Sequence, residues 1–412
     1  MMFSLSASQL IGVTFLTLTT VASAEIKIGG MATLEGAFKA LGDDGILGIN
    51  MALDEVGGKI GDQKVVLVTA STDGSADRAV SEAKRLIEKE GIKILIGPLS
   101  GDEGIAIKEL AKSYPDLTFI NGGSAAQDTT MKSPAPNFFR FGTDGAQWLA
   151  GVGRTAFDRK GYKRVVVIGE DYSFPYTQVY GFIKEFCTRG GKIVKKFWVK
   201  IGENDYAPIL KQFPNQKEYD AIFLALSGSD VVNFVSQLAR YRIKKPLIGG
   251  TNAIGGDILT SISTYGAYID GMLSGGPIPY NYQRKEWLDF VARYKKYQDI
   301  DKLTLFAYSY YIATKAAVLA LGETGGSVSD AKKLHAVLSN LTFDTPTGKT
   351  KLDQNRNGIT SNFVMEVYLD KKTNKMAIRT LEQMNNVDQA LGGSYQKIAA
   401  EPSPSRDFPN CK

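Results

Sequence analysis

Histidine is nearly absent from this chain, which has one, His335, among 412 residues. A single imidazole removes most of the support for Ser-His-Asp catalysis and for histidine-rich metal sites. His335 lies on a predicted helix, where we expect it to be partly exposed. The chain also contains no G-x-S-x-G elbow and no G-x-x-x-x-G-K-[ST] loop, and the IGGMATLEG of its first strand does not match G-x-G-x-x-G. These absences predict a protein that is not an enzyme and uses no cofactor.

A metal site is equally poorly supported. The segment DQNRNG (353–358) matches the start of a calcium loop, D-x-N-x-N-G, but Val364 occupies the twelfth position, where such loops carry a bidentate Glu. Arg356 in the segment and Lys351 just before it add positive charge, which disfavours a cation. We therefore interpret the segment as a tight turn at Asn357-Gly358 and predict no metal site.

Clusters of basic residues are missing too, although the formal net charge is +6. Lys195-Lys196 and Lys371-Lys372 are isolated pairs, and no Arg-rich run with interleaved aromatic residues occurs. The positive balance indicates a solvated surface, so nucleic acid is not an expected partner.

Cysteine is scarce: Cys187 and Cys411 are the only two. In an oxidising compartment such a pair favours a disulfide. Two unpaired thiols are the alternative, because a wide separation in sequence does not decide between them.

The first 24 residues contain no Lys, Arg, Asp or Glu, hold an apolar stretch at 10–18, and end in Ala22-Ser23-Ala24. This is the pattern of a signal peptide cleaved after Ala24, although the usual positive start is missing. A membrane anchor would need about 20 apolar residues, more than this stretch has. The residue directly after the cleavage site is Glu25 rather than a cysteine, so we expect an exported protein without a lipid anchor.

Short apolar runs alternate with helical patterns through the mature chain. The first series has strands at 25–29, 65–69, 92–97 and 117–121, with helices at 42–55, 77–89 and 103–112 between them. The second has strands at 164–169, 193–199, 221–226 and 246–250, with helices at 147–158, 176–188, 206–213 and 231–241. Such βαβ series form parallel sheets covered on both faces, so we predict an α/β protein with two doubly wound lobes.

The rest of the chain is predicted to be more varied. Helices are expected at 284–298, 303–321 and 330–338, followed by a turn-rich stretch at 345–358 and a strand at 363–369. The tail, 396–412, is expected to be loosely held.

The two lobes repeat one feature. LIGPLSGDE in the first and FLALSGSDV in the second both run from an apolar strand through Leu-Ser-Gly to an acid that opens a helix. Ligands of open α/β sheets bind at these carboxyl ends of strands, so a ligand held between the lobes is the simplest use of the repeat. Taken alone, Ser100 is more simply a helix N-cap.

Several segments occur in an order and spacing that resemble a known family. They are IKIGGMATLEGAFKALG, GINMALDEVGGKIGDQKVVLV, STDGSADRAVSEAKRLIEKEGIKILIGPLSG, FINGGSAAQD, FFRFGTDG, VVVIGEDYSFPY and TPTGKTKLDQNRNG. The mature chain resembles type I periplasmic substrate-binding proteins of ABC importers, in the leucine/isoleucine/valine-binding branch. The resemblance implies a periplasmic protein, expected to be a monomer, that delivers a small solute to a membrane permease.

The resemblance also implies the arrangement of the lobes. Three crossings are expected near 141–145, 273–280 and 358–363. The N-terminal lobe would comprise 25–141 plus 280–357, and the C-terminal lobe 145–273 plus 363–395. The lobes are expected to close on the ligand by hinge motion at 142–145 and 275–280.

Ligand contacts implied by the resemblance come from both lobes. Ser100 and Gly101 would bind a ligand carboxylate, with Asp102 and Glu103 pointing away from it. The full set is Ser100, Gly101, Gly123, Ser124, Ala125, Tyr172, Phe174, Ser227, Thr251 and Asn252.

One position departs from the family pattern. Thr251 stands near the Glu that pairs with a ligand ammonium, and Thr251 carries no charge. Either Glu170 or Asp171 replaces that acid, or the ligand lacks an ammonium. The expected ligand is therefore amino-acid-like, with another small carboxylate or aromatic acid as the alternative. A receptor's sensory partner and, with less support, an exported α/β enzyme are the other possibilities.

Overall fold

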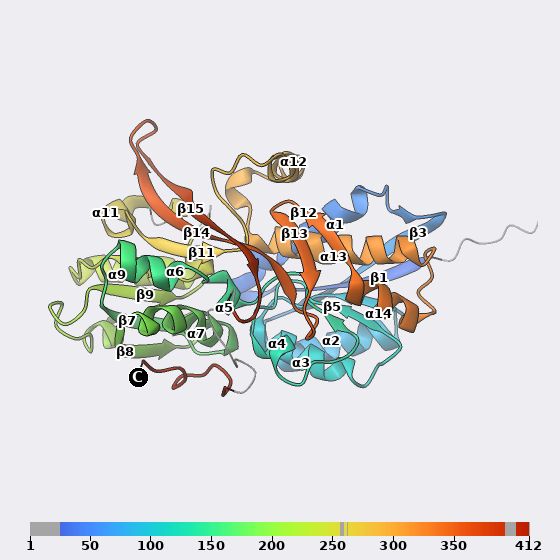
Figure 1. Ribbon diagram of the computed structural model, residues 1–412, viewed down its shortest axis with the longest axis horizontal. Coiled ribbons are helices and arrows are strands. Elements are labelled where there is room, and N and C mark those ends of the chain that lie inside the picture. The colour runs from blue at the N-terminus through green and yellow to red at the C-terminus, as the bar shows by residue number, and fades with distance from the viewer. Residues whose placement is uncertain (1–24, 256–258, 262, 392–400, 412) are drawn as a thin grey trace, which may run out of the picture.

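The computed structural model describes residues 25–255, 259–261, 263–391 and 401–411. They form two α/β lobes that lie side by side (Figure 1), one on a mostly parallel sheet and the other on a mixed sheet with a parallel central part. The predicted signal peptide lies outside the described residues.

The first lobe contains a six-stranded sheet. Its strand order is β2 (Lys59–Ile60), β3 (Gln63–Thr72), β1 (Ile26–Thr33), β4 (Ile94–Ile96), β5 (Thr118–Ile120) and β6 (Phe138–Phe139). Every pair is parallel except the β2–β3 hairpin. The helical segments of this lobe are η1 (Gly36–Phe38), α1 (Lys39–Asp54), α2 (Ala76–Glu88), α3 (Gly101–Ala111), α4 (Asp128–Met131), α12 (Lys285–Tyr294), η5 (Ile300–Lys302), α13 (Leu305–Glu323) and α14 (Ala331–Asn340).

Side-chain alternation along the short central strands explains the layers. In β4, Ile94 and Ile96 belong to the core that includes α1 and α13, whereas Leu95 belongs to the opposite core with α2 and α3. Both faces of the strand are buried, so its sequence is a continuous apolar run.

Helix α13 is long and apolar enough to cross a membrane, but 78% of its most apolar stretch is buried, as in a core helix.

A nine-stranded sheet underlies the second lobe. Its order is β12 (Thr342–Thr345), β13 (Gly348–Leu352), β14 (Gly358–Asp370), β11 (Leu273–Gly276), β10 (Leu247–Gly249), β9 (Ala221–Ala225), β7 (Arg164–Glu170) and β8 (Lys192–Val199), and β15 (Lys375–Val387) also pairs with β14. The β12–β13 end of this sheet reaches over the first lobe, where it lies against α13 and α14 (Figure 1). The helical segments are α5 (Gly145–Trp148), α6 (Val152–Arg154), the π-helical turn η2 (Thr155–Arg159), α7 (Ser173–Thr188), α8 (Ala207–Leu210), α9 (Ser229–Arg240), η3 (Thr251–Ala253), η4 (Ser263–Tyr265) and α11 (Gly266–Ile269).

Three segments of chain cross between the lobes: those that join β6 to α5, β11 to α12, and β13 to β14. The first and third touch closely, because a Cβ on Gly358 would lie 2.4 Å from the Gly142 carbonyl oxygen. The residue boundaries of the two lobes given above stay a prediction.

A fully buried arginine, Arg140, joins the first and third crossings. Its Nε donates to Asn357 Oδ1 at 2.6 Å, its Nη1 to the Ala126 carbonyl at 2.7 Å, and its Nη2 to Thr130 Oγ1 at 2.5 Å. Asp144 lies 3.6 Å from the guanidinium and balances its charge. A buried cation needs such partners, so this network holds the connection between the lobes in one arrangement.

Most predicted elements are confirmed, one is incomplete and two predictions are wrong. The helix expected at 147–158 is divided into α5, α6 and η2 because Gly151 adopts a left-handed conformation with φ 85°. The stretch 345–358 has the expected turns but also contains strand β13, which was not predicted. The described part of the tail, 401–411, is held to α7 by a disulfide and ion pairs rather than loosely.

The turn and the histidine were predicted more closely. Asp353 Oδ1 accepts the N–H groups of Asn355 and Asn357, and Arg356 has the left-handed φ of 59°. The tight turn therefore exists, but it precedes Asn357-Gly358 instead of containing it. His335 is partly exposed as expected, and burial against the sheet lowers the pKa of its imidazole.

Candidate functional site

A cleft lies between the lobes and has two parts. The outer cleft has a volume of about 820 Å³ and is lined by α1 from the first lobe and by the segments after β9 and β10 from the second. The inner cavity lies next to it and shares Leu41, Asn252 and Phe306 with it. The inner cavity has a volume of only about 10 Å³, room for about one water molecule.

Most of the predicted site residues meet at the inner cavity. Seven of the ten line it: Ser100, Gly101, Gly123, Ala125, Tyr172, Phe174 and Asn252. Thr251 lines the outer cleft instead. Ser124 and Ser227 are in neither lining, although each directly adjoins a residue that is.

Ser100 has a structural role in addition to its place in the lining. Its Oγ accepts the Glu103 N–H at 3.4 Å and donates to the Gly74 carbonyl at 2.9 Å, while Glu103 Oε2 accepts the Ser100 N–H at 2.8 Å. This is a capping box, which explains why helix α3 begins here. The N–H groups of Gly101 and Asp102 in the first turn have no partner within the helix and can bind an anion.

The starts of helices α3 and α7 meet at the cavity. A Cβ on Gly101 would lie 2.4 Å from Ser173 Oγ and 3.0 Å from the Phe174 nitrogen, so any larger residue would force the start of α7 to shift. Asp102 Oδ1 accepts the Ser173 N–H at 3.3 Å across the lobes. The expectation that Asp102 points away from the site is therefore wrong, whereas Glu103 is buried in the capping box and does point away.

The turn after β5 contributes backbone and small side chains. A Cβ on Gly123 would lie 2.5 Å from the Phe306 ring, so only glycine lets that ring approach. Ser124 differs from its neighbours Gly123 and Ala125, because its hydroxyl lies against Gly104 of α3. The predicted ligand contact at Ser124 would therefore have to come from its backbone.

Aromatic rings form much of the cavity wall and come from both lobes. The Tyr172 ring lies 6.3 Å from the rings of Phe38, in the first lobe, and Phe174, in the second. Phe174 also contacts Trp148 edge-on, with centroids 5.6 Å apart. Such geometry suits a flat apolar group inserted among the rings.

Polar side chains of the second lobe are mostly bonded to one another. Thr251 donates its N–H to Gln178 Oε1 at 2.7 Å, and its hydroxyl accepts from Gln178 Nε2 at 3.2 Å. Asn252 Nδ2 lies 3.5 Å from Ser227 Oγ. Asn252 is the second-lobe residue that lines both the inner cavity and the outer cleft with an amide able to donate and accept.

The two acids considered as substitutes lie behind the cavity wall. Glu170 is completely buried, and its Oε1 accepts the Ser227 N–H at 2.8 Å. Burial raises the pKa of Glu170 well above its usual value, and the charge of Asp230 acts in the same direction. Asp171 accepts hydrogen bonds from Tyr176 and Arg406. Neither acid is among the residues that line the inner cavity.

Sequence reasoning missed five lining residues: Phe38, Leu41, Leu99, Trp148 and Phe306. Phe38 and Leu41 belong to the EGAFKALG stretch that carries the family resemblance, which was the available signal. Phe306 is in the first turn of α13, which is buried along most of its length, so the sequence pattern does not distinguish Phe306 from core residues. Among the described residues, no group of three or more His, Cys, Asp or Glu side chains is placed to hold a metal ion.

Residues 25–373 match the periplasmic binding protein family. The chain belongs to this family. It is a family of substrate-binding proteins rather than enzymes. Among curated relatives, Leu/Ile/Val-binding protein homolog 6 of Brucella melitensis biotype 1 is 24% identical over 345 residues, which cover 82% of this chain and 86% of that protein.

Solved structures of the family have the same fold. A solute-binding protein of an ABC transporter from R. palustris, in complex with benzoate, superposes with a TM-score of 0.79 at 22% identity, covering 90% of this chain and 99% of that one. A leucine-binding protein from Thermotoga maritima gives a TM-score of 0.74 at 21% identity, covering 87% and 99%. At these identities the likeness shows the type I periplasmic binding fold, and the ligand has to be argued from the cleft.

Proposed function

We propose that this periplasmic binding protein captures a small carboxylic acid with an apolar or aromatic body and delivers it to the membrane permease of an ABC transporter. The observation that carries the proposal is the lining of the inner cavity. Aromatic rings surround the start of helix α3, and no acidic side chain is among the described residues that line it. Helix-start N–H groups suit the carboxylate, and the rings suit the body of the ligand.

No acidic side chain is among the described residues that line the inner cavity, and the Asp102 carboxylate beside it already accepts the Ser173 N–H, which argues against a zwitterion. A buried ammonium is costly unless an acid or several acceptors face it. Thr251 has no charge, and its hydrogen bonds go to Gln178. Asp171 is paired with Arg406. The solved neighbour that holds benzoate supports the same chemistry, since benzoate has a carboxylate and no ammonium.

An amino acid is the second candidate, and one observation favours it. Oε2 of the buried Glu170 has no hydrogen-bond partner within the described structure, and the side chain lies under Tyr172 and Ser227 of the cavity wall. A movement of Tyr172 would bring this oxygen to a ligand ammonium. The leucine-binding neighbour is consistent with this alternative.

Ligand entry requires the lobes to separate, because the inner cavity is far smaller than benzoate or leucine. Opening would join it to the outer cleft, which is of the size usual for ligand pockets. We infer hinge motion at 142–145 and 275–280, a monomeric protein, and export with cleavage after Ala24. A sensory role beside a receptor would use the same closure.

Calorimetric titration with matched ligands tests the proposal. Phenylpyruvate and phenylalanine differ mainly in the keto and ammonium groups, and benzoate and leucine extend the comparison. We expect benzoate or phenylpyruvate to bind at least tenfold more tightly than phenylalanine. Phe174→Leu should weaken that binding, whereas Phe157→Leu, in the same lobe but packed on Phe186, should not. Preference for the amino acids would instead support the second candidate, and turnover of any of these compounds would contradict both.

A further inference from the structure

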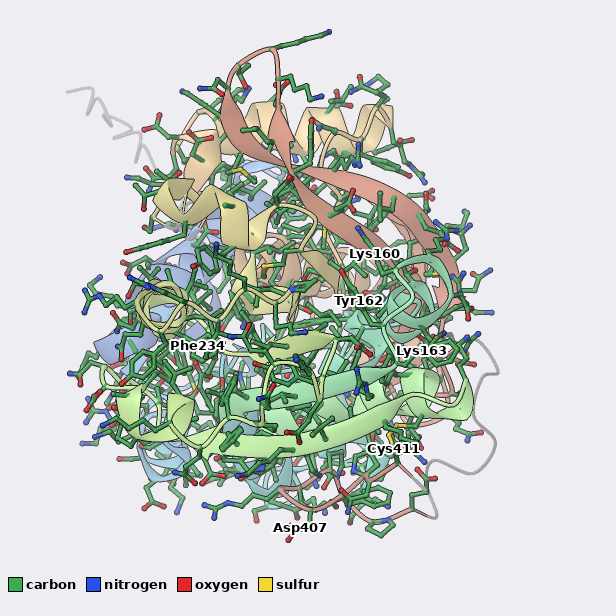
Figure 2. The ribbon with its side chains drawn as sticks, turned by 90° about the vertical axis from the view of Figure 1, so that its left-hand side faces the viewer. Lys160, Tyr162, Lys163, Phe234, Asp407 and Cys411 are labelled. Carbon is green, nitrogen blue, oxygen red and sulfur yellow. A yellow bond between two sulfur atoms is a disulfide. The ribbon has the colours of Figure 1, made fainter. Side chains whose placement is uncertain are left out.

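The C-terminal segment 401–411 lies beyond the residues that match the family. It runs as an extended strip beneath α7 and β8 in Figure 1, and Figure 2 shows Asp407 and Cys411 at the lower edge of the second lobe. We call this segment the tail strip. Its contacts lead from the far end of α7 back to the beginning of that helix, which carries the aromatic residues of the ligand site.

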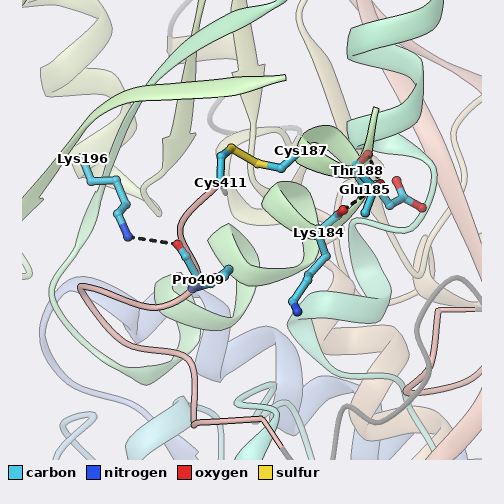
Figure 3. Close-up of a disulfide and its surroundings, with 7 residues drawn as sticks. All are labelled: Lys184, Glu185, Cys187, Thr188, Lys196, Pro409 and Cys411. Atoms are coloured by element: carbon cyan, nitrogen blue, oxygen red, sulfur yellow. Dashed lines mark hydrogen bonds between the residues drawn. A yellow bond between two sulfur atoms is a disulfide. The ribbon is translucent and has the colours of Figure 1, made fainter. Parts of the chain in front are cut away.

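The tail strip is fastened to the C-terminal end of α7. Cys411 forms a disulfide with Cys187, and Lys196 Nζ donates to the Pro409 carbonyl at 3.1 Å (Figure 3). The Phe408 ring lies 6.0 Å from the ring of Tyr180, which precedes Cys187 by about two turns of α7. These contacts leave Arg406 only five residues from a covalent anchor.

The other end of the strip contacts both lobes. The Glu401 carboxylate accepts hydrogen bonds from Tyr180 and Lys184 of α7, while Lys132 of the first lobe donates to the Glu401 carbonyl at 2.5 Å. The strip is thus held at its two ends, with Arg406 between them.

Arg406 meets the residue that precedes the cavity wall. Its guanidinium makes a two-pronged contact with Asp171, with Nε donating to Oδ1 at 2.7 Å and Nη2 donating to Oδ2. Tyr176 donates to the same carboxylate. Asp171 therefore joins Arg406 to both ends of the segment 171–176, which contains Tyr172 and Phe174 of the inner cavity.

We propose that the tail strip positions the aromatic wall of the ligand site, and that the Cys187–Cys411 disulfide is what makes this contact effective. The inference rests on the proposed function for the location of the site. An exposed ion pair contributes little on its own, because holding long side chains in place costs conformational entropy. Fixing the strip near Arg406 raises the effective concentration of its guanidinium at Asp171. Reduction of the disulfide would then loosen segment 171–176 and weaken ligand binding.

Hydrogen–deuterium exchange on the ligand-free, oxidised full chain tests the positioning directly. Arg406→Gln and Cys411→Ser should both speed exchange in peptides covering 171–176, and dithiothreitol should do the same to the wild type but not to Cys411→Ser. Arg189→Gln is the matched control, since it removes a surface pair with Asp158 at the end of the same helix. It should leave 171–176 unchanged.

Calorimetry with benzoate and leucine as probes tests the effect on binding. We expect Arg406→Gln and Cys411→Ser to lower the affinity for whichever probe the wild type binds by about three- to tenfold, mainly through faster dissociation. Arg406→Lys should lower that affinity by less. Unchanged exchange at 171–176 would overturn the proposal whatever the ligand. Faster exchange with unchanged affinity would also overturn it. If the wild type binds no carboxylic or amino acid, the proposed function fails, and the exchange data alone then decide whether the strip holds the segment.

Discussion

Asp102 Oδ1 accepts a hydrogen bond from the backbone nitrogen of Ser173 at 3.3 Å, and this bond joins the first turns of two helices from opposite lobes. The N-terminal ends of α3 and α7 both carry partial positive charge. The Asp102 carboxylate lies between them and reduces their repulsion. Because the two residues belong to different lobes, this interaction exists only when the cleft is closed.

Asp102→Ala should therefore shift the ligand-free protein toward an open cleft. The loss of one charge-assisted hydrogen bond and of a favourable helix-end charge amounts to about 1 kcal/mol. Small-angle X-ray scattering should show a larger radius of gyration for the variant than for the wild type.

Asp77→Ala provides the control for this experiment. Asp77 is also the second residue of its helix, α2, and it is exposed. Its removal takes away the same helix-end charge without touching the other lobe, so the radius should stay at the wild-type value. Equal radii for all three proteins would mean that the Asp102–Ser173 bond does not contribute to closure.

The fold was largely predictable because most strands are buried on both faces. Runs such as ILI in β4 and AIFLA in β9 are fully buried and stand out from the amphipathic helices between them. Strand β15 was missed because its residues are mostly half-buried and mixed in polarity, and its pairing with β14 is a tertiary contact. The division of the helix at Gly151 was missed because a glycine in a sequence does not reveal its φ, and the close approach of Val364 and Met384, which leaves no room for a Cβ, is a tertiary contact.

The site was predictable where a local motif exists. Ser100 and Gly101 occupy a strand–turn–helix junction that the sequence shows directly. Trp148 and Phe306 lie far from that junction in sequence and join it only through the packing of helices, which no local pattern reports. The pairing of Cys187 with Cys411 was one of two open alternatives, and the disulfide is confirmed, because the tail lies along α7.

Stability should depend on the protonation of Asp44. This carboxyl lines the outer cleft and accepts hydrogen bonds from Tyr294 and from the Thr304 backbone and hydroxyl. Burial nevertheless raises its pKa to about 6. The folded protein therefore binds this proton more tightly than the unfolded chain, so the Asp44 contribution to the free energy of unfolding falls as pH rises from about 4 to 6 and is constant above that.

Urea unfolding of Asp44→Asn and wild type at pH 4.5 and pH 7 measures this effect. With the pKa raised from 3.8 to about 6, the stability of the variant relative to the wild type should increase by about 2 kcal/mol between these two pH values. A relative stability that is independent of pH would show that Asp44 titrates normally.

The disulfide should contribute substantially to stability. Its cysteines are 224 residues apart, so it restricts a long loop in the unfolded chain. Replacing both cysteines by serine should lower the free energy of unfolding by about 2–5 kcal/mol. Urea denaturation of oxidised wild type and of the double variant gives the difference, and dithiothreitol should affect only the wild type. Two free thiols in the denatured, unreduced exported protein would contradict the bond itself.

Gly101→Ala should separate closure from folding. In the closed cleft the added Cβ would lie 2.4 Å from Ser173 Oγ and 3.0 Å from the Phe174 nitrogen, closer than such atoms approach, whereas separated lobes leave it room. Overpacking of this kind costs about 1–3 kcal/mol, and it destabilises only the closed state. Ligand affinity should therefore fall by about tenfold or more and the radius of gyration should rise, while thermal stability without ligand stays near the wild-type value. Gly322→Ala, in α13 with open space around it, should change neither affinity nor radius. Wild-type affinity in Gly101→Ala would mean that the ligand-bound cleft does not bring the starts of α3 and α7 together.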